Sequence, residues 1–263
     1  MFLLQKELNE NFLSVEYAIW KDLLESSKQK YIEISNDELS LINNVDFKKE
    51  HNIDIKQCIP LGTIEFTNSF FNRFYNIKKM NPVEVPACLR TDEFLKRQYS
   101  IIKGNATPKT GRFFIKNVSD LKSFTFCGDI EHLFNSNNNL PNIDNEKFYQ
   151  VSEIIDIISE YRIYVIQGKI YAVAYYDGDP CIFPDMKLIN KANIIYSFQK
   201  DYLKSYTMDV AITDKGTCIL EVHPLFSCGI YQTVLGTDFL QGYKDAMQYV
   251  LKFNNEPIEF SNF

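Results

Sequence analysis

Two carboxylates near the end of the chain stand where they would face each other across a β-hairpin. The segments 206–213 and 217–223 have the composition of two strands joined by a tight turn. Gly216 suits the left-handed third position of a three-residue hairpin loop. The register that this loop sets places Asp209 opposite Glu221, and it makes the other face of the hairpin apolar.

Opposed carboxylates call for a compensating cation. Residues that face each other on a sheet lie about 5 Å apart at Cβ, and like charges at that distance are destabilising. Mg²⁺ is the natural candidate, because it prefers oxygen ligands and completes its shell with water and phosphates. The predicted metal ligands are therefore Asp209 and Glu221, with His223 two residues further along the same face. The alternative is a solvated acidic face whose carboxylates splay apart into water.

A second hairpin repeats the design. It pairs 162–166 with 170–175 and carries Arg162 and Glu160 on one face. A fixed guanidinium suits phosphate oxygens, and a nearby carboxylate can accept ribose hydroxyls. The alternative is a same-face ion pair, which contributes little to stability.

Composition limits the class of protein. The chain has 263 residues, 45% hydrophobic and 14% aromatic, which is enough for a substantial core. A net charge of -6 argues against a partner bound through a continuous basic surface, so nucleic acid is not the expected partner.

The cysteines predict no metal site of their own. Six are present, without a C-x-x-C pair and without zinc-site spacing to a histidine, so they read as reduced thiols: Cys58, Cys88, Cys127, Cys181, Cys218 and Cys228. No signal peptide and no apolar run of membrane-spanning length stands out, and we expect a cytoplasmic protein without a membrane segment.

The other elements follow from periodicity and turn residues. Strands are expected at 1–4, 31–34 and 112–116, and helices at 12–24, 190–203 and 238–252. The run 58–66 is expected to form a buried strand, a tight turn at Gly62 and a short second element. Pro82 and Pro86 bracket an extended linker, because each proline restricts the residue before it to extended geometry. A soft domain boundary is placed there.

Four segments, taken in order, resemble ATP-grasp proteins, specifically the small bacterial and phage clade distinguished by two arginines and a lysine. The resemblance spans residues 59–231, and none of its segments is specific alone. The four segments are Ile59–Phe66, Phe114-Ile115-Lys116-Asn117, Glu153 and Glu160 with Arg162, and Asp209 with Glu221-Val222-His223-Pro224.

The resemblance implies roles by position. Lys116 would contact the nucleotide, with Lys122 a further donor in the lid, where glycines are sparse. The backbone of Glu153, Ile154 and Ile155 would read the adenine edge, and Glu160 would hold the ribose. Arg162 would lie near the γ-phosphate, and Asp209 with Glu221 would hold Mg²⁺.

Other implied positions are less well matched. Arg73 is the first choice for the earlier phosphate-binding residue, followed by Lys78 and Lys79, and Arg97 is a candidate for the second arginine. His223 stands where the family has asparagine, and it could approach the metal or act on substrate. Thr207 stands where most relatives carry an arginine that stabilises the acyl phosphate.

The implied fold is α/β (α+β): two α/β subdomains that clamp the nucleotide, preceded by a small N-terminal α/β layer. The expected division is 1–84 for that layer and 85–263 for the ATP-grasp domain, itself split into 85–155 and 156–263. The implied activity is ATP- and Mg²⁺-dependent ligation of a carboxylate to an amine through an acyl phosphate, on an amino acid, peptide or protein terminus. The alternatives are a nucleotide-binding module without ligase activity and an ATP-dependent enzyme acting on RNA ends.

Overall fold

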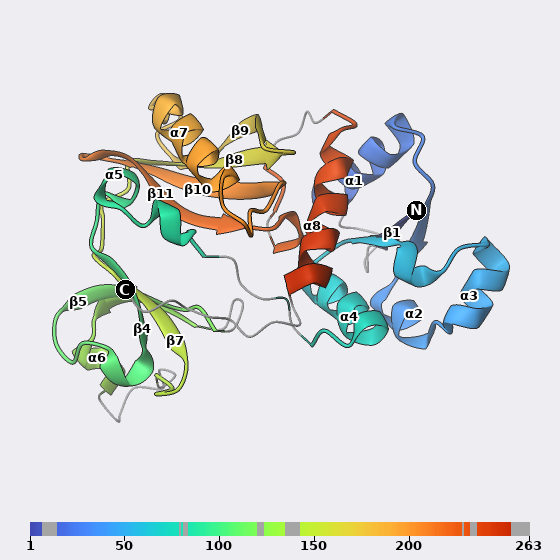
Figure 1. The fold of residues 1–263 in the computed structure, drawn as a ribbon, viewed down its shortest axis with the longest axis horizontal. Helices are drawn as coiled ribbons and strands as arrows, with labels where there is room; N and C mark the ends of the chain where they lie inside the picture. Colours follow the sequence, from blue (N-terminus) through green and yellow to red (C-terminus); the bar gives the residue numbers. More distant parts are fainter. Residues whose placement is uncertain are drawn as a thin grey trace.

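In the part of the chain that it describes, the computed structural model contains three sheets with helices packed around them (Figure 1). The residues that the structure describes are 1–6, 15–78, 80, 84–119, 124–134, 143–227, 229–231 and 236–253. The expected α/β class is confirmed. Within the described residues, the protein contains no helix with the length and hydropathy of a membrane span.

The first sheet is parallel and has the order β2-β1-β3. Its strands are β1 (Phe2–Gln5), β2 (Tyr31–Ile34) and β3 (Ile59–Leu61). The helices of this region are α1 (Val15–Ser26), α2 (Asn36–Leu41), α3 (Asn44–His51) and α4 (Ile64–Tyr75), with a 3₁₀ turn η1 (Ile55–Gln57). Helix α8 (Phe239–Phe253), the last that the structure describes, lies beside α1 and β1 (Figure 1). Trp20 Nε1 donates to Tyr243 Oη at 2.8 Å.

The second sheet is antiparallel and has the order β4-β7-β5-β6. Its strands are β4 (Tyr99–Lys103), β5 (Arg112–Asn117), β6 (Thr125–Asp129) and β7 (Phe148–Ser152). Short helical elements connect or precede them: η2 (Ala87–Leu89), α5 (Asp92–Leu95), η3 (Gly104–Ala106) and α6 (Glu131–Phe134). A small separate core around Ile115 and Val151 holds this sheet together.

The third sheet is antiparallel, has the order β11-β10-β8-β9, and carries both predicted hairpins. Its strands are β8 (Ser159–Ile166), β9 (Lys169–Gly178), β10 (Tyr206–Thr213) and β11 (Gly216–His223). Helix α7 (Met186–Ser197) packs on it, and η4 (Leu225–Ser227) follows β11.

Both hairpins have the predicted register at the site residues, but their turns are shorter than predicted and each contains a bulge. The expected three-residue loops are wrong, because Thr213 pairs with Gly216 and Ile166 with Lys169 across two-residue turns. A bulge in each hairpin, at Leu220 and at Tyr171, then shifts the register by one residue. The pairing of the site residues is therefore confirmed: Asp209 with Glu221, Thr207 with His223, and Arg162 with Ala174.

Helix α7 begins four residues before the predicted start at 190. Its first turn is capped by the Asp185 carboxylate, which accepts from the backbone N–H groups of Lys187 and Leu188. The structure also contains α2, which was not predicted although Ser35 and Glu38 form a complete capping box. Only a short second element was expected after β3, whereas α4 runs for 12 residues.

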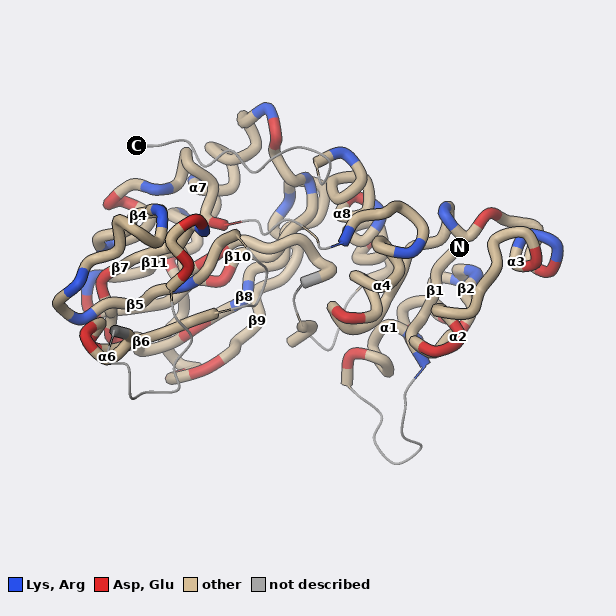
Figure 2. Tube along the Cα trace, turned by 90° about the horizontal axis from the view of Figure 1, so that it is seen from below, with Lys and Arg blue, Asp and Glu red and all other residues tan. Residues whose placement is uncertain are grey.

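Basic and acidic residues are interspersed along the described chain, as Figure 2 shows. The apolar residues, by contrast, are concentrated. One hydrophobic core runs from the first sheet to Tyr164 of β8 and to α8, so the first sheet and the third are packed together. The expected boundary at residue 84 stays a prediction.

Two glycines with positive φ permit a matched test of the fold. Gly178 (φ 88°) ends β9, and a Cβ there would meet the Ile158 carbonyl oxygen at 2.2 Å, whereas Gly216 (φ 96°) has nothing within 4 Å of that position. We expect Gly216→Ala to cost about 1–2 kcal/mol from φ strain alone. Gly178→Ala should cost about 1–3 kcal/mol more, because backbone must move. Urea unfolding of both variants measures the difference, and equal losses would contradict the close approach.

Candidate active site

A cavity of about 330 Å³ is lined by residues of both the second and the third sheet. Lys116 enters it from β5, and Glu160 and Glu221 enter it from β8 and β11. The segment 153–158, which joins β7 to β8, forms a further wall. The cavity therefore lies where a flat ligand could be held between the two sheets and the segment that connects them.

Most of the predicted nucleotide contacts meet in this cavity. Leu220 also lines the cavity. Of the six predicted nucleotide contacts, Lys122 lies outside the described residues. The other five predicted contacts stand on three separate segments of the sequence, and the structure brings them together. They are Lys116, Glu153, Ile154, Ile155 and Glu160.

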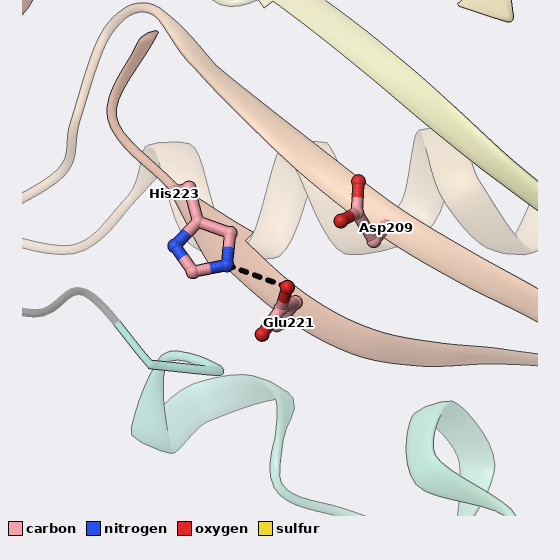
Figure 3. A group of neighbouring side chains, drawn as sticks. All are labelled: Asp209, Glu221 and His223. Atoms are coloured by element: carbon pink, nitrogen blue, oxygen red, sulfur yellow. Dashed lines mark ion pairs between the residues drawn. The ribbon is translucent and has the colours of Figure 1, made fainter. Parts of the chain in front are cut away.

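The predicted metal ligands adjoin the cavity. Asp209 on β10 and Glu221 and His223 on β11 offer ligand atoms that lie within 4.8 Å of one another (Figure 3). Asp209 and His223 are buried and Glu221 is partly buried. Carboxylate oxygens with one imidazole nitrogen form a donor set that fits a divalent cation.

Each carboxylate of this cluster already has a side-chain cation. The Arg162 guanidinium donates to Asp209 through Nε and Nη2, both at 2.7 Å, and through Nη1 to the Gly229 carbonyl at 2.9 Å. Lys116 Nζ lies 2.5 Å from Glu221 Oε2. Arg162 and Lys116 therefore offset the repulsion between Asp209 and Glu221. The two opposed carboxylates do not by themselves require a bound metal.

These contacts shift the ionisation of the pair. Burial would raise the pKa of Glu221, but its contacts with His223 and Lys116 outweigh burial and hold the pKa well below its usual range. Burial would likewise lower the pKa of Lys116, but Glu84 and Glu221 outweigh it and raise the pKa. Both groups are therefore charged at neutral pH.

Glu84 is a member of this charge cluster that was not predicted from the sequence. It is only 6% exposed, its Oε1 lies 3.5 Å from Lys116 Nζ, and neither carboxylate oxygen has a hydrogen-bond partner among the described residues. It stands in the linker between Pro82 and Pro86, where no periodicity marks which residues are buried. No signal in the sequence could have found it.

The structure brings Arg97 to the cavity and places Arg73 elsewhere. Arg97 is 7% exposed, lines the cavity, and donates through Nη1 to the carbonyls of Leu95 at 3.0 Å and Ile219 at 2.9 Å. Arg73 is exposed on α4 and donates to the Ile42 carbonyl at 2.7 Å. Lys78 is also exposed, and Lys79 lies outside the described residues.

A further bulge lies in β9, beside the Arg162–Asp209 pair. Tyr176 is the additional residue where the β8–β9 register shifts, and its ring lies 4.7 Å from that of Tyr231. The Arg162 guanidinium lies 4.8 Å from the centre of the Tyr231 ring. The two tyrosines are 46% and 40% exposed, so they form an open aromatic edge beside the Arg162–Asp209 pair.

Glu160 has a strongly shifted ionisation. Burial, followed by the charges of Asp209 and Glu221, raises its pKa from 4.5 to about 7. Between those two values the folded protein keeps a proton that the unfolded chain has lost. The free energy of unfolding must therefore fall as the pH rises through this window.

We expect Glu160→Gln to remove that loss. In metal-free buffer, the variant should gain stability relative to the wild type between pH 5 and pH 8, because the amide cannot ionise. Urea unfolding at both pH values measures the gain. Glu146→Gln, at a side chain that is 82% exposed, is the matched control and should show no such trend. A pH-independent difference for Glu160→Gln would contradict the raised pKa.

Comparisons with solved structures identify the fold. A D-alanine–D-alanine ligase from Bacillus anthracis superposes with a TM-score of 0.52 and 11% identity, over 95% of this chain and 98% of that chain. An N5-carboxyaminoimidazole synthetase from Staphylococcus aureus gives 0.55 and 10%, over 94% and 77%. The D-cycloserine synthetase DcsG gives 0.52 and 9%, over 95% and 99%.

The sequence comparisons identify the family. None of the curated proteins matches the chain. Residues 94–239, more than half of the chain, match the ATP-grasp domain model for family 2 of the clade with two arginines and a lysine. This span contains all the residues that line the cavity and the three residues of the carboxylate cluster, and the expected ATP-grasp fold is confirmed. The chain therefore belongs to family 2 of this two-arginine-and-lysine clade of ATP-grasp domain proteins.

Proposed function

We propose that the protein is an ATP- and Mg²⁺-dependent ligase that joins a carboxylate to an amine through an acyl phosphate. One observation carries the proposal: the cavity collects five expected nucleotide contacts and also receives Glu221 of the carboxylate cluster. In this proposal, adenine is recognised beside the place where the phosphates react. The membership of the ATP-grasp family supports the same reaction class.

The cavity suggests how ATP is held. The backbone of 153–155 faces the adenine edge, Glu160 accepts from the ribose, and Lys116 donates to the phosphates. Arg162 then lies on the reacting side of the cluster, where its rigid fork is held by Asp209 and Gly229. A preorganised guanidinium at that place stabilises charge that develops as the phosphoryl group moves.

The reaction has two displacements. An oxygen of the substrate carboxylate forms a bond to the γ-phosphorus and ADP leaves, which gives an acyl phosphate. The amine nitrogen then attacks the acyl carbon, phosphate leaves, and the amine loses a proton. A divalent cation held by Asp209 and Glu221 would supply neutralisation of the phosphate charge. We propose an amino acid, a peptide or a protein terminus as the acceptor.

A second candidate is a nucleotide-binding module without ligase activity. Thr207 favours it, because it is fully buried beside His223 and its hydroxyl has no partner among the described residues. A threonine hydroxyl carries no charge, so Thr207 cannot stabilise an acyl phosphate as an arginine would. Magnesium-dependent ATP binding without any turnover would support this candidate.

The first test combines product analysis with two substitutions. In a screen of amine and carboxylate pairs, the wild type should release ADP and phosphate, whereas adenylate transfer to RNA ends would release AMP and pyrophosphate. Asp209→Asn and Glu221→Gln should each lower kcat/KM by at least about a hundredfold, since each removes charge from the phosphate site. Asp214→Asn, in the exposed turn of the same hairpin, is the control. Full activity of both variants would refute the proposed site.

The second test separates the two arginines. Arg97→Gln should raise the Kd for ATP by about tenfold, the loss expected when a charged hydrogen-bond donor is removed from the site. Arg73→Gln should leave the Kd unchanged, because that side chain lies on helix α4, beside the first sheet. Isothermal titration measures both, and thermal denaturation checks that Arg97→Gln folds. The reverse ranking would show that the nucleotide reaches the N-terminal layer.

A further inference from the structure

His223 is placed as a third member of the carboxylate cluster by strand geometry. Residues two apart on a strand point to the same face, so His223 follows Glu221 on that face of β11. The cross-strand partner of Glu221 is Asp209. The ligand atoms of all three residues lie within 4.8 Å of one another.

The imidazole is oriented for binding through one nitrogen. Its Nε2 lies 2.7 Å from Glu221 Oε1, and Figure 3 shows this edge turned toward the carboxylates. Its Nδ1 is buried and has no hydrogen-bond partner among the described residues. A histidine that served only to hold the fold would be expected to use both nitrogens.

Both carboxylates of the cluster have a counter-charge other than His223. Glu221 already has Lys116 at 2.5 Å, and Asp209 has Arg162 at 2.7 Å. One cation therefore stands against each carboxylate before the histidine is counted. A metal bound there would replace the present contact of His223 Nε2 with Glu221 Oε1, because a metal binds the lone pair of an imidazole nitrogen that carries no proton.

We propose that His223 binds the divalent cation through Nε2, and that it makes this site prefer Mn²⁺ to Mg²⁺. The proposal rests on the proposed nucleotide–metal function and adds the identity of the ion. Mg²⁺ is held by oxygen ligands and accepts nitrogen reluctantly, whereas Mn²⁺ keeps a similar octahedral shell and accepts an imidazole more readily. His223→Asn replaces the imidazole with a neutral amide and removes that preference.

The test reads the metal–nitrogen bond directly. The full chain is produced with ¹⁵N-labelled histidine, loaded with Mn²⁺ and ADP, and examined by pulsed electron paramagnetic resonance. We expect a ¹⁵N coupling of directly bound imidazole in the wild type and in His132→Asn, and its loss in His223→Asn. Titrations with Mn²⁺ and with Mg²⁺ should show that His223→Asn weakens Mn²⁺ by about tenfold or more and leaves Mg²⁺ unchanged.

The outcomes separate this proposal from the function on which it rests. If Mn²⁺ binds with ADP, is lost in Asp209→Asn, and shows no ¹⁵N coupling, then the role of His223 is refuted and the nucleotide–metal site stands. If no Mn²⁺ binds with ADP, both are refuted. Should His223→Asn not fold, a double variant of His51 and His132 to Asn leaves His223 as the only histidine. A coupling in that protein supports the proposal, and its absence overturns it.

Discussion

Lys116 of the second sheet holds Glu221 of the third, and this ion pair joins the two sheets at the cavity. Buried carboxylates are costly unless positive charge is brought to them. Glu84 and Glu221 both lie beside Lys116, and Asp209 lies beside Arg162, so each acidic group has a cation from another segment of the chain within 4 Å. The same atoms are those that phosphates and a metal would use. A ligand that binds there must exchange partners with the protein, because each of these charges already has a counter-charge.

The bulges of the third sheet serve this arrangement. The one at Leu220 restores the pairing of the two carboxylates, and Arg97 binds the carbonyl of the residue beside it, Ile219. Another brings Tyr176 against Tyr231. Bulges are found next to active sites because they re-aim single side chains without ending a strand. The additional residues of these two bulges, Leu220 and Tyr176, therefore lie at the edges of the site.

The sequence predicted the pairing of the two carboxylates, but it did not predict the path of the chain that produces this pairing. Alternation and turn residues were enough to pair Asp209 with Glu221, but only because two errors cancel, a loop one residue too long and an unforeseen bulge. The strand at the bulge is held by Arg97, which is 122 residues away from Ile219, and local patterns carry no record of such a contact. Glu84 was missed for the same reason. The caps that begin α7 and α2, by contrast, are local signals that the sequence does contain.

The position of α8 has a consequence for how the chain is made. This helix completes the core of the first sheet, and Trp20 and Tyr243, which are 223 residues apart, form a buried hydrogen bond. At about 5–20 residues per second, a ribosome needs roughly ten to forty seconds to reach α8 after the first strands have emerged. During that interval the apolar face that α8 will cover is open to water. The order of synthesis therefore leaves the core of the first sheet incomplete until α8 has emerged.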